Sequence, residues 1–134
     1  MLKRAITTPK GKAIGPYSLA ISTGPGTARI DLVFVSGQIG LDAATGKLVE
    51  GDVRAQARQA LENLKAILEA AGVTFAHVAK TVIFLTDMAD FAAVNEVYKG
   101  YVSEPYPARS TVAVAALPLG AKVEIEMIAS RSVI

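Results

Sequence analysis

The sequence predicts an α+β fold in which two helices pack on one face of a mixed β-sheet. The order of periodic segments supports this prediction, because it reads hairpin, helix, strand, helix, strand, strand. The length of 134 residues is close to the commonest domain size, so residues 1–134 are expected to form a single domain. Two helices can cover only one face of a sheet, which leaves the other face bare within one chain.

The N-terminal part is predicted to form a β-hairpin followed by a loop. A short strand is expected at residues 17–22 and a stronger one at residues 29–38. The glycines and the proline of segment 22–27 favour a turn between these strands. Segment 39–51 reads as a loop that includes a short second hairpin with Thr45-Gly46 as its turn.

Two amphipathic helices are predicted. The first runs from Asp52, a good N-cap residue, to Gly72, a good C-cap residue. Its apolar residues recur at steps of three and four, as expected for one helix face: Ala57, Leu61, Leu64, Leu68 and Ala71. The second helix is expected between Asp87, as its cap, and Gly100. Its apolar face consists of Phe91, Val94 and Tyr98.

Three further strands are expected at residues 78–86, 110–117 and 121–130. The first is nearly continuous in β-branched and apolar residues, which is typical of a central strand covered on both faces. The last strand alternates, with Lys122, Glu124 and Glu126 on one face and Val123, Ile125, Met127 and Ile128 on the other. Strand 110–117 has small or apolar residues on both faces. Because the sheet is expected to be apolar on both faces and two helices cover only one of them, we predict that the bare face packs on other subunits in a closed homo-oligomer.

Composition excludes several classes of protein. Hydrophobic residues make up 51% of the chain and charged residues 19%, which excludes disorder. The chain has no cysteine, so disulfides, thiolate zinc sites and a cysteine nucleophile are excluded, and a reducing, cytoplasmic location is expected. Basic residues are scattered, and no apolar run approaches the roughly 20 residues that span a bilayer. Neither nucleic acid nor a membrane is therefore expected as a partner.

Arg109 is the first candidate for chemistry, because it stands behind a proline turn at the head of an otherwise apolar strand. A strand-end arginine ordinarily pairs with a surface acid. Its planar guanidinium also fits a carboxylate through two hydrogen bonds, which would make it a carboxylate clamp. Pro105 and Pro107 stiffen the chain that leads to it. The residues alone are compatible with either interpretation.

Two acids of the last predicted strand, Glu124 and Glu126, are the second candidates. Both fit a solvated strand face. If a neighbouring subunit covers that face, one of them would be desolvated and could activate a water molecule, and the alternation does not choose between them. Gly37 interrupts a predicted strand, which is typical of a bulge or of a close backbone approach. The glycine spacing around it does not match a phosphate-binding loop.

Three other polar or aromatic residues have an ordinary structural interpretation. Tyr17 could close a pocket or pack on the predicted hairpin. Asn95 lies beside the apolar face of the second helix, where solvation is the usual role. His77 is the only histidine, which excludes a multi-histidine metal site, and it lies at a helix-to-strand connection where a structural role is expected.

Six motifs, in the same order along the chain, match one known family almost end to end. They are AIGPYS (residues 13–18), VSGQIG (35–40), QARQALENLKAILEAAG (56–72), VNEVY (94–98), YPARSTV (106–112) and VEIEMIA (123–129). The sequence thereby resembles the RidA family, also called YjgF/YER057c/UK114, of small enamine/imine deaminases. The resemblance implies a chorismate-mutase-like fold and a homotrimer with sites in the clefts between subunits. It further implies hydrolysis of 2-imino acids, released as enamines by pyridoxal-phosphate dehydratases, to 2-keto acids and ammonia, with neither a metal nor an organic cofactor.

The resemblance also implies roles for individual residues. Arg109 would bind the substrate carboxylate, Glu124 would polarise the attacking water, and the main chain of Thr111 would contact the imine nitrogen. The rest of the pocket would be lined, in part from the adjoining subunit, by Tyr17, Ser36, Gly37 and Asn95. Many family members carry a cysteine at the position of Thr111, and an acid and an arginine at the positions of Ala113 and Ala116.

Two other functions are compatible with such a family. One is a ligand-binding or regulatory trimer that turns nothing over, although the presence of Glu124 argues against it. The other is the translation-inhibiting ribonuclease or chaperone-like activity attributed to some relatives. The sequence has neither a basic patch with interleaved aromatic residues nor a pair of histidines for RNA cleavage, so this function ranks last.

Overall fold

The fold is the predicted mixed sheet with helices on one face. The computed structural model describes residues 3–23 and 30–132. In chain order its strands are β1 (Arg4–Ile6), β2 (Ala20–Ser22), β3 (Ile30–Gln38), β4 (Leu41–Asp42), β5 (Lys47–Leu48), β6 (Val78–Leu85), β7 (Ala108–Ala113) and β8 (Val123–Ser132). Within the described residues, six of them form one sheet in the order β1-β2-β3-β8-β6-β7, and β4 and β5 form a separate ribbon. All neighbours in the large sheet are antiparallel except β6 and β7, which are parallel.

Helix α1 (Val53–Ala70) forms between its predicted caps. The side chain of Asp52 accepts a hydrogen bond from the N–H of Ala55, and Gly72 follows the helix with a φ of 80°. The apolar face packs on β3 and β8 and includes Ala57, Ala60, Leu61, Leu64, Ile67 and Leu68. Burial of each larger side chain contributes about 1.5–3 kcal/mol, so this helix face supplies much of the core.

Helix α2 (Phe91–Lys99) ends before Gly100, as predicted, but Asp87 does not cap it. Asp87 instead caps a short 3-10 helix, Met88–Asp90, by accepting a hydrogen bond from the N–H of Ala89. This short helix lies between the end of β6 and the start of α2. No helix in the described part of the chain has the length and apolarity needed to cross a membrane.

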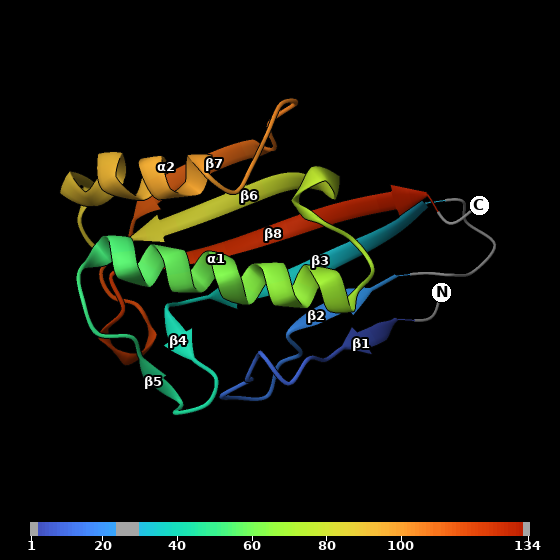
Figure 1. Ribbon diagram of the computed structural model, residues 1–134, viewed down its shortest axis with the longest axis horizontal. Coiled ribbons are helices and arrows are strands. Elements are labelled where there is room, and N and C mark those ends of the chain that lie inside the picture. Colours follow the sequence, from blue (N-terminus) through green and yellow to red (C-terminus); the bar gives the residue numbers. More distant parts are fainter. Residues whose placement is uncertain (1–2, 24–29, 133–134) are drawn as a thin grey trace.

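The helices α1 and α2 lie side by side on the same face of the sheet (Figure 1). Beneath them the core is closed by inward residues of the central strands, among them Val33, Ile125 and Met127. Strand β6 alternates between buried and partly exposed residues, so the prediction that it is covered on both faces is wrong for one chain. Its apolar outward residues belong to the bare face.

The opposite face of the sheet is apolar and uncovered within one chain. Leu32, Phe34 and Val112 are 37%, 42% and 45% exposed there. Glu124 and Glu126 lie on the same face, because each alternates with a buried residue of β8. The prediction of a bare second face is therefore confirmed, and the homotrimer that would cover it stays a prediction.

Several strand boundaries differ from the sequence-based prediction. The strand expected at 17–22 begins only at Ala20, and β1, which pairs with it, was not predicted. The strand expected at 110–117 spans Ala108–Ala113, because its partner β6 ends at Leu85. The last strand runs from Val123 to Ser132 rather than from 121 to 130. Of the turn expected at 22–27, residues 24–27 lie outside the described residues, as does the expected start of a strand at Arg29.

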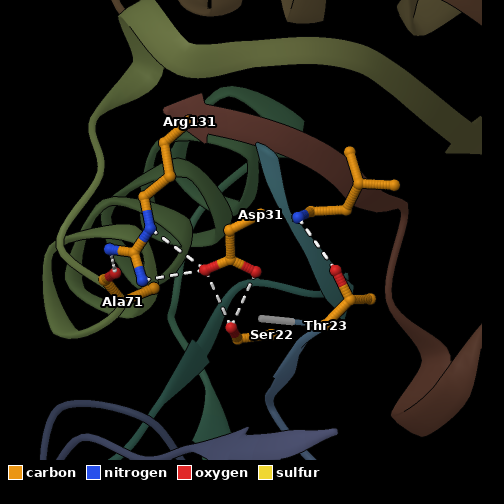
Figure 2. A network of polar contacts seen from close by, with 6 residues as sticks. Ser22, Thr23, Asp31, Ala71 and Arg131 are labelled. Atoms are coloured by element: carbon orange, nitrogen blue, oxygen red, sulfur yellow. Dashed lines mark hydrogen bonds and ion pairs between the residues drawn. The ribbon is translucent and has the colours of Figure 1, made fainter. Parts of the chain in front are cut away.

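A buried carboxylate ties three strands to the end of α1 (Figure 2). The Ser22 hydroxyl on β2 lies 2.9 Å from each carboxylate oxygen of Asp31 on β3. From β8, Arg131 donates to Asp31 through Nε at 3.1 Å and through Nη2 at 2.9 Å. Its Nη1 donates to the carbonyl oxygen of Ala71, just after α1. Asp31 is fully buried, so this pairing compensates a charge that would otherwise be costly to desolvate.

We expect Asp31→Asn to lower the free energy of unfolding by about 3 kcal/mol, because the amide leaves Arg131 without its buried counter-charge. Urea denaturation at one fixed protein concentration measures this change. Glu69→Gln, at an exposed position of α1, is the matched control and should stay within about 0.5 kcal/mol of wild type. Equal stabilities of the Asp31 and Glu69 variants would contradict the account.

Candidate active site

Arg109 lies near the start of β7, where α2 covers its side chain. Its Nη1 donates a 2.7 Å hydrogen bond to Oδ1 of Asn95. Its Cζ lies 5.1 Å from the centroid of the Tyr98 ring and 5.7 Å from that of the Phe91 ring. The three α2 residues are four and three positions apart, so they share one face of the helix. Asn95 is therefore in contact with Arg109 and is not simply a solvated helix residue.

The guanidinium of Arg109 has no carboxylate partner among residues 3–23 and 30–132. The ion pairs in this part of the chain are Arg54–Glu96 and Arg131–Asp31. A cleft of about 430 Å³ opens beside Arg109. Its other lining residues are Asn95, Tyr98, Lys99, Val102, Tyr106 and Pro107. The arginine is thus held by neutral groups at the wall of a cleft that presents cations and no acid.

Thr111, two residues further along β7, lies beside Arg109 on the covered face. Its hydroxyl oxygen is buried and has no hydrogen-bond partner among the described residues. Val114, directly after β7, donates its N–H to the carbonyl of Leu85 at 2.7 Å. Main-chain groups alternate in direction along a strand, so those of the even-numbered residues of β7 also point towards β6. The N–H and C=O of Thr111 therefore point to the other side, which is the open edge of the described sheet.

Glu124 lies on the bare face of β8 against an irregularity in β3. The pairing register of these strands shifts between Val35 and Gln38, which is the predicted bulge. A Cβ at Gly37 would lie 2.7 Å from Oε1 of Glu124. Only glycine at this position lets the main chain approach the carboxylate so closely. The sequence predicted a bulge or a close backbone approach at Gly37, and the structure shows both.

Glu124 is distinguished from Glu126 by this contact and by its electrostatics. Burial raises the pKa of the Glu124 carboxyl, and the negative charge of Glu126 raises it further. Glu124 therefore holds a proton at higher pH than a fully solvated glutamate does. A carboxylate with a raised pKa is a stronger base, which suits a group that accepts a proton from water.

Tyr17 and Ser36 lie in the same region as Glu124. They line a cleft of about 350 Å³ together with Lys12, Ile14, Gly37, Gln38, Ile39, Leu41, Pro118, Glu124 and Glu126. The Ser36 hydroxyl donates to the carbonyl of Ser18 at 2.6 Å, and the Tyr17 hydroxyl accepts from the N–H of Ile14 at 3.2 Å. These bonds fix the loop before β2 against β3 and thereby form one wall of the cleft.

The two clefts lie on opposite faces of the sheet. Arg109 is the register partner of Thr81, which is fully buried under the helices. Glu124 is the register partner of Phe84, which is partly exposed on the bare face. Register partners on neighbouring strands point to the same side, so the two charged side chains cannot reach one small ligand within one chain. The predicted site residues therefore form two groups, with Arg109, Asn95 and Thr111 in one, and Tyr17, Ser36, Gly37 and Glu124 in the other.

Comparison with known proteins identifies the family. Residues 7–131 match the family model described as Endoribonuclease L-PSP. A mouse protein named 2-iminobutanoate/2-iminopropanoate deaminase is 48% identical, over 96% of this chain and 92% of its own length. The chain belongs to the RidA family.

Two further comparisons extend this result. Protein DfrA of Myxococcus xanthus is 53% identical, over 96% of each chain. The crystal structure of RidA from an Antarctic Psychrobacter species has a TM-score of 0.86 at 49% identity, and the match covers 94% of this chain and 98% of that one. The resemblance to the RidA family, inferred from the motifs, is confirmed. The predicted α+β fold is confirmed as well.

Two residues that surround Arg109 in the candidate site were not predicted as site residues from the sequence. Phe91 and Tyr98 were assigned to the apolar face of the second helix, and their rings also lie against Arg109. The available signal was the position of Asn95 between them on one helix face. The structural role predicted for His77 is confirmed, because its Nδ1 accepts from the N–H of Thr74 at 3.0 Å. The described residues contain no cluster of three potential metal-ligating His, Asp or Glu side chains.

We expect Gly37→Ala to displace the carboxylate of Glu124 while the protein stays folded, since the methyl group meets the end of a flexible side chain. As burial decreases, the pKa of Glu124 should fall towards its ordinary value, which an NMR titration of the side-chain carboxyl carbon measures. Gly100→Ala is the matched control, because its methyl would make only an ordinary contact, 3.4 Å from the Val97 carbonyl oxygen. An unchanged titration of Glu124 in Gly37→Ala would refute the close approach.

Proposed function

We propose that this chain hydrolyses 2-imino acids, and the enamines that tautomerise to them, to 2-keto acids and ammonia. The observation that carries the proposal is the guanidinium of Arg109, which neutral groups hold at a cleft without a carboxylate partner among the described residues. In a 2-imino acid the carboxylate is bonded to the imine carbon. An arginine that binds the carboxylate through two hydrogen bonds therefore also positions the reacting carbon. The named activity of the mouse relative supports the same chemistry.

In this mechanism Glu124 activates the attacking water. The water oxygen forms a bond to the carbon of the protonated imine, Glu124 takes one of the water protons, and the π electrons of C=N move to the nitrogen, which gives a neutral carbinolamine. Glu124 returns this proton to the nitrogen, so that the C–N bond breaks with its electron pair on nitrogen and ammonia leaves. The remaining hydroxyl gives its proton to the Glu124 carboxylate as C=O forms, and Glu124 releases that proton to solvent. The main chain of Thr111, directed to the open edge of β7, is suited to hydrogen bond with the imine nitrogen. The raised pKa of Glu124 suits a group that both accepts and returns a proton.

The proposed site requires two copies of the chain, because Arg109 and Glu124 belong to opposite faces of one sheet. The cleft beside β7 of one copy would meet the Glu124 cleft of the next. The exposed apolar residues of the bare face, including Leu32, Phe34 and Val112, would supply the contact area. A closed homotrimer repeats one such contact three times, so that the bare sheet face of every copy is buried.

The description of the family model as an endoribonuclease does not alter the proposal. Acid–base cleavage of RNA commonly uses two histidines, and this sequence has only His77, whose Nδ1 is engaged with Thr74. The alternative function, a ligand-binding protein without catalysis, would bind the imino acid but not convert it. Only a deaminase would show turnover that Glu124→Gln reduces, so this measurement distinguishes the two functions.

The wild-type protein should accelerate imine loss when a dehydratase generates 2-aminoacrylate in the assay. Arg109→Lys should lower kcat/KM about 30-fold, because an ammonium group cannot form the two parallel hydrogen bonds. Glu124→Gln should lower kcat by about 100-fold and keep carboxylate binding, because proton transfer rather than binding is lost.

Glu126→Gln is the matched control for the carboxyl group. It removes the smaller of the two contributions to the raised pKa of Glu124 and leaves the Glu124 carboxyl in place, so its kcat should fall far less than that of Glu124→Gln. Equal decay of the imine with and without wild-type protein would refute the deaminase proposal. An equal loss of kcat in the Glu124 and Glu126 variants would show that the position against Gly37 does not select the reacting acid.

A further inference from the structure

The Arg109 cradle consists of the three α2 residues that contact the guanidinium, namely Phe91, Asn95 and Tyr98. Two of these groups are aromatic rings and one is a carboxamide, so all three are neutral. A carboxylate in the cradle would hold Arg109 more strongly but would compensate its charge before a ligand arrived. A neutral cradle fixes the cation and leaves most of its five N–H donors for a ligand.

Tyr98 is the most firmly held member of the Arg109 cradle. Its side chain is buried, and its hydroxyl donates a 3.0 Å hydrogen bond to Oγ1 of Thr81. Burial raises the pKa of Tyr98, so the hydroxyl keeps the proton that it donates. Thr81 is itself fully buried, and it is the register partner of Arg109 on the adjoining strand. The tip of the ring is thus anchored to the strand next to the arginine that its face contacts.

Phe91 completes the Arg109 cradle from the start of α2. Its ring lies at the surface of the chain, 36% exposed, which contrasts with the buried ring of Tyr98. The Asp87-capped 3-10 turn leads directly into Phe91 and fixes where α2 begins. A guanidinium within about 6 Å of an aromatic face is attracted by the ring quadrupole without loss of its charge.

We propose that Tyr98 and Phe91 are positioning residues for carboxylate binding, because they orient the Arg109 guanidinium through neutral cation–π contacts. This inference rests on the proposed function for the identity of the substrate. The step that it describes, capture of a carboxylate by Arg109, is shared by the imino acid and by the 2-keto acid formed from it. Binding of the keto acid can therefore be measured without any turnover.

The test compares the dissociation constant for 2-oxobutanoate, from isothermal titration calorimetry, with KM and kcat for the imine. Tyr98→Leu removes the ring face and should raise both Kd and KM about tenfold, with kcat changed less than about twofold. Phe91→Leu should raise Kd about threefold in the same pattern. Tyr98→Phe keeps the ring and loses the hydrogen bond to Thr81, so its Kd should stay within about twofold of wild type.

Glu96→Gln is the matched control on the same helix, because its side chain pairs with Arg54 and not with Arg109. It should leave Kd and KM unchanged. Wild-type Kd values in both leucine variants would overturn the inference, as would a loss in Tyr98→Phe equal to that in Tyr98→Leu. If Tyr98→Leu does not fold, the surface variant Phe91→Leu decides the question.

The two proposals fail in distinguishable ways. A wild-type protein that binds 2-oxobutanoate but does not accelerate imine loss would refute the deaminase proposal, and the leucine variants would still test the Arg109 cradle through Kd. A wild-type protein that does not bind 2-oxobutanoate would overturn the cradle inference itself. Retention of carboxylate binding in Tyr98→Phe together with its loss in Tyr98→Leu supports the inference. Both variants lose the hydrogen bond to Thr81 and only Tyr98→Leu loses the ring, so a role of the hydroxyl alone would weaken binding equally in both.

Discussion

The alternation of side chains along paired strands determines where the chemistry of this protein can take place. Arg109 shares its side of the sheet with Thr81 under the helices, whereas Glu124 shares the other side with Phe84. A strand cannot turn one of these side chains over without a one-residue slip that would also expose its buried residues. The two charged groups are therefore separated by the sheet within each chain. A site that uses both must be formed by two copies.

The protein treats its partly or fully buried charges in two different ways. Asp31 and Arg131 neutralise each other, and their network joins β2, β3, β8 and the end of α1 (Figure 2). Arg109 and Glu124 have no such partner among the described residues. Neutral contacts hold the arginine, and partial burial against Gly37 holds the carboxylate with a raised pKa. Unpaired charges of this kind are unfavourable in an empty site and become favourable when a ligand supplies the opposite charge.

The sequence predicted those features that depend on local pattern. The period of α1, its caps and the alternation of β8 are visible because each is repeated over many residues. The three-residue strand β1 was missed, since pairing with β2 and not its own composition makes it a strand. The order of strands was not predictable either, because β7 pairs with β6 and not with β8, its neighbour in sequence. For the site, the motifs pointed to Arg109 and Glu124. That these two side chains lie on opposite faces of the sheet follows only from the strand order and register. The contacts of Phe91 and Tyr98 with Arg109 were missed because aromatic residues on the apolar face of a helix usually belong to the core.

Mixed oligomers test most directly the claim that each site takes Arg109 from one copy and Glu124 from another. Arg109→Ala and Glu124→Gln are each expected to be inactive alone. When equal amounts are co-expressed, about one quarter of the sites should contain both intact residues, so about one quarter of the wild-type deaminase activity should return. Native mass spectrometry would verify that the mixed oligomers form. Mixed oligomers without recovered activity would contradict the account.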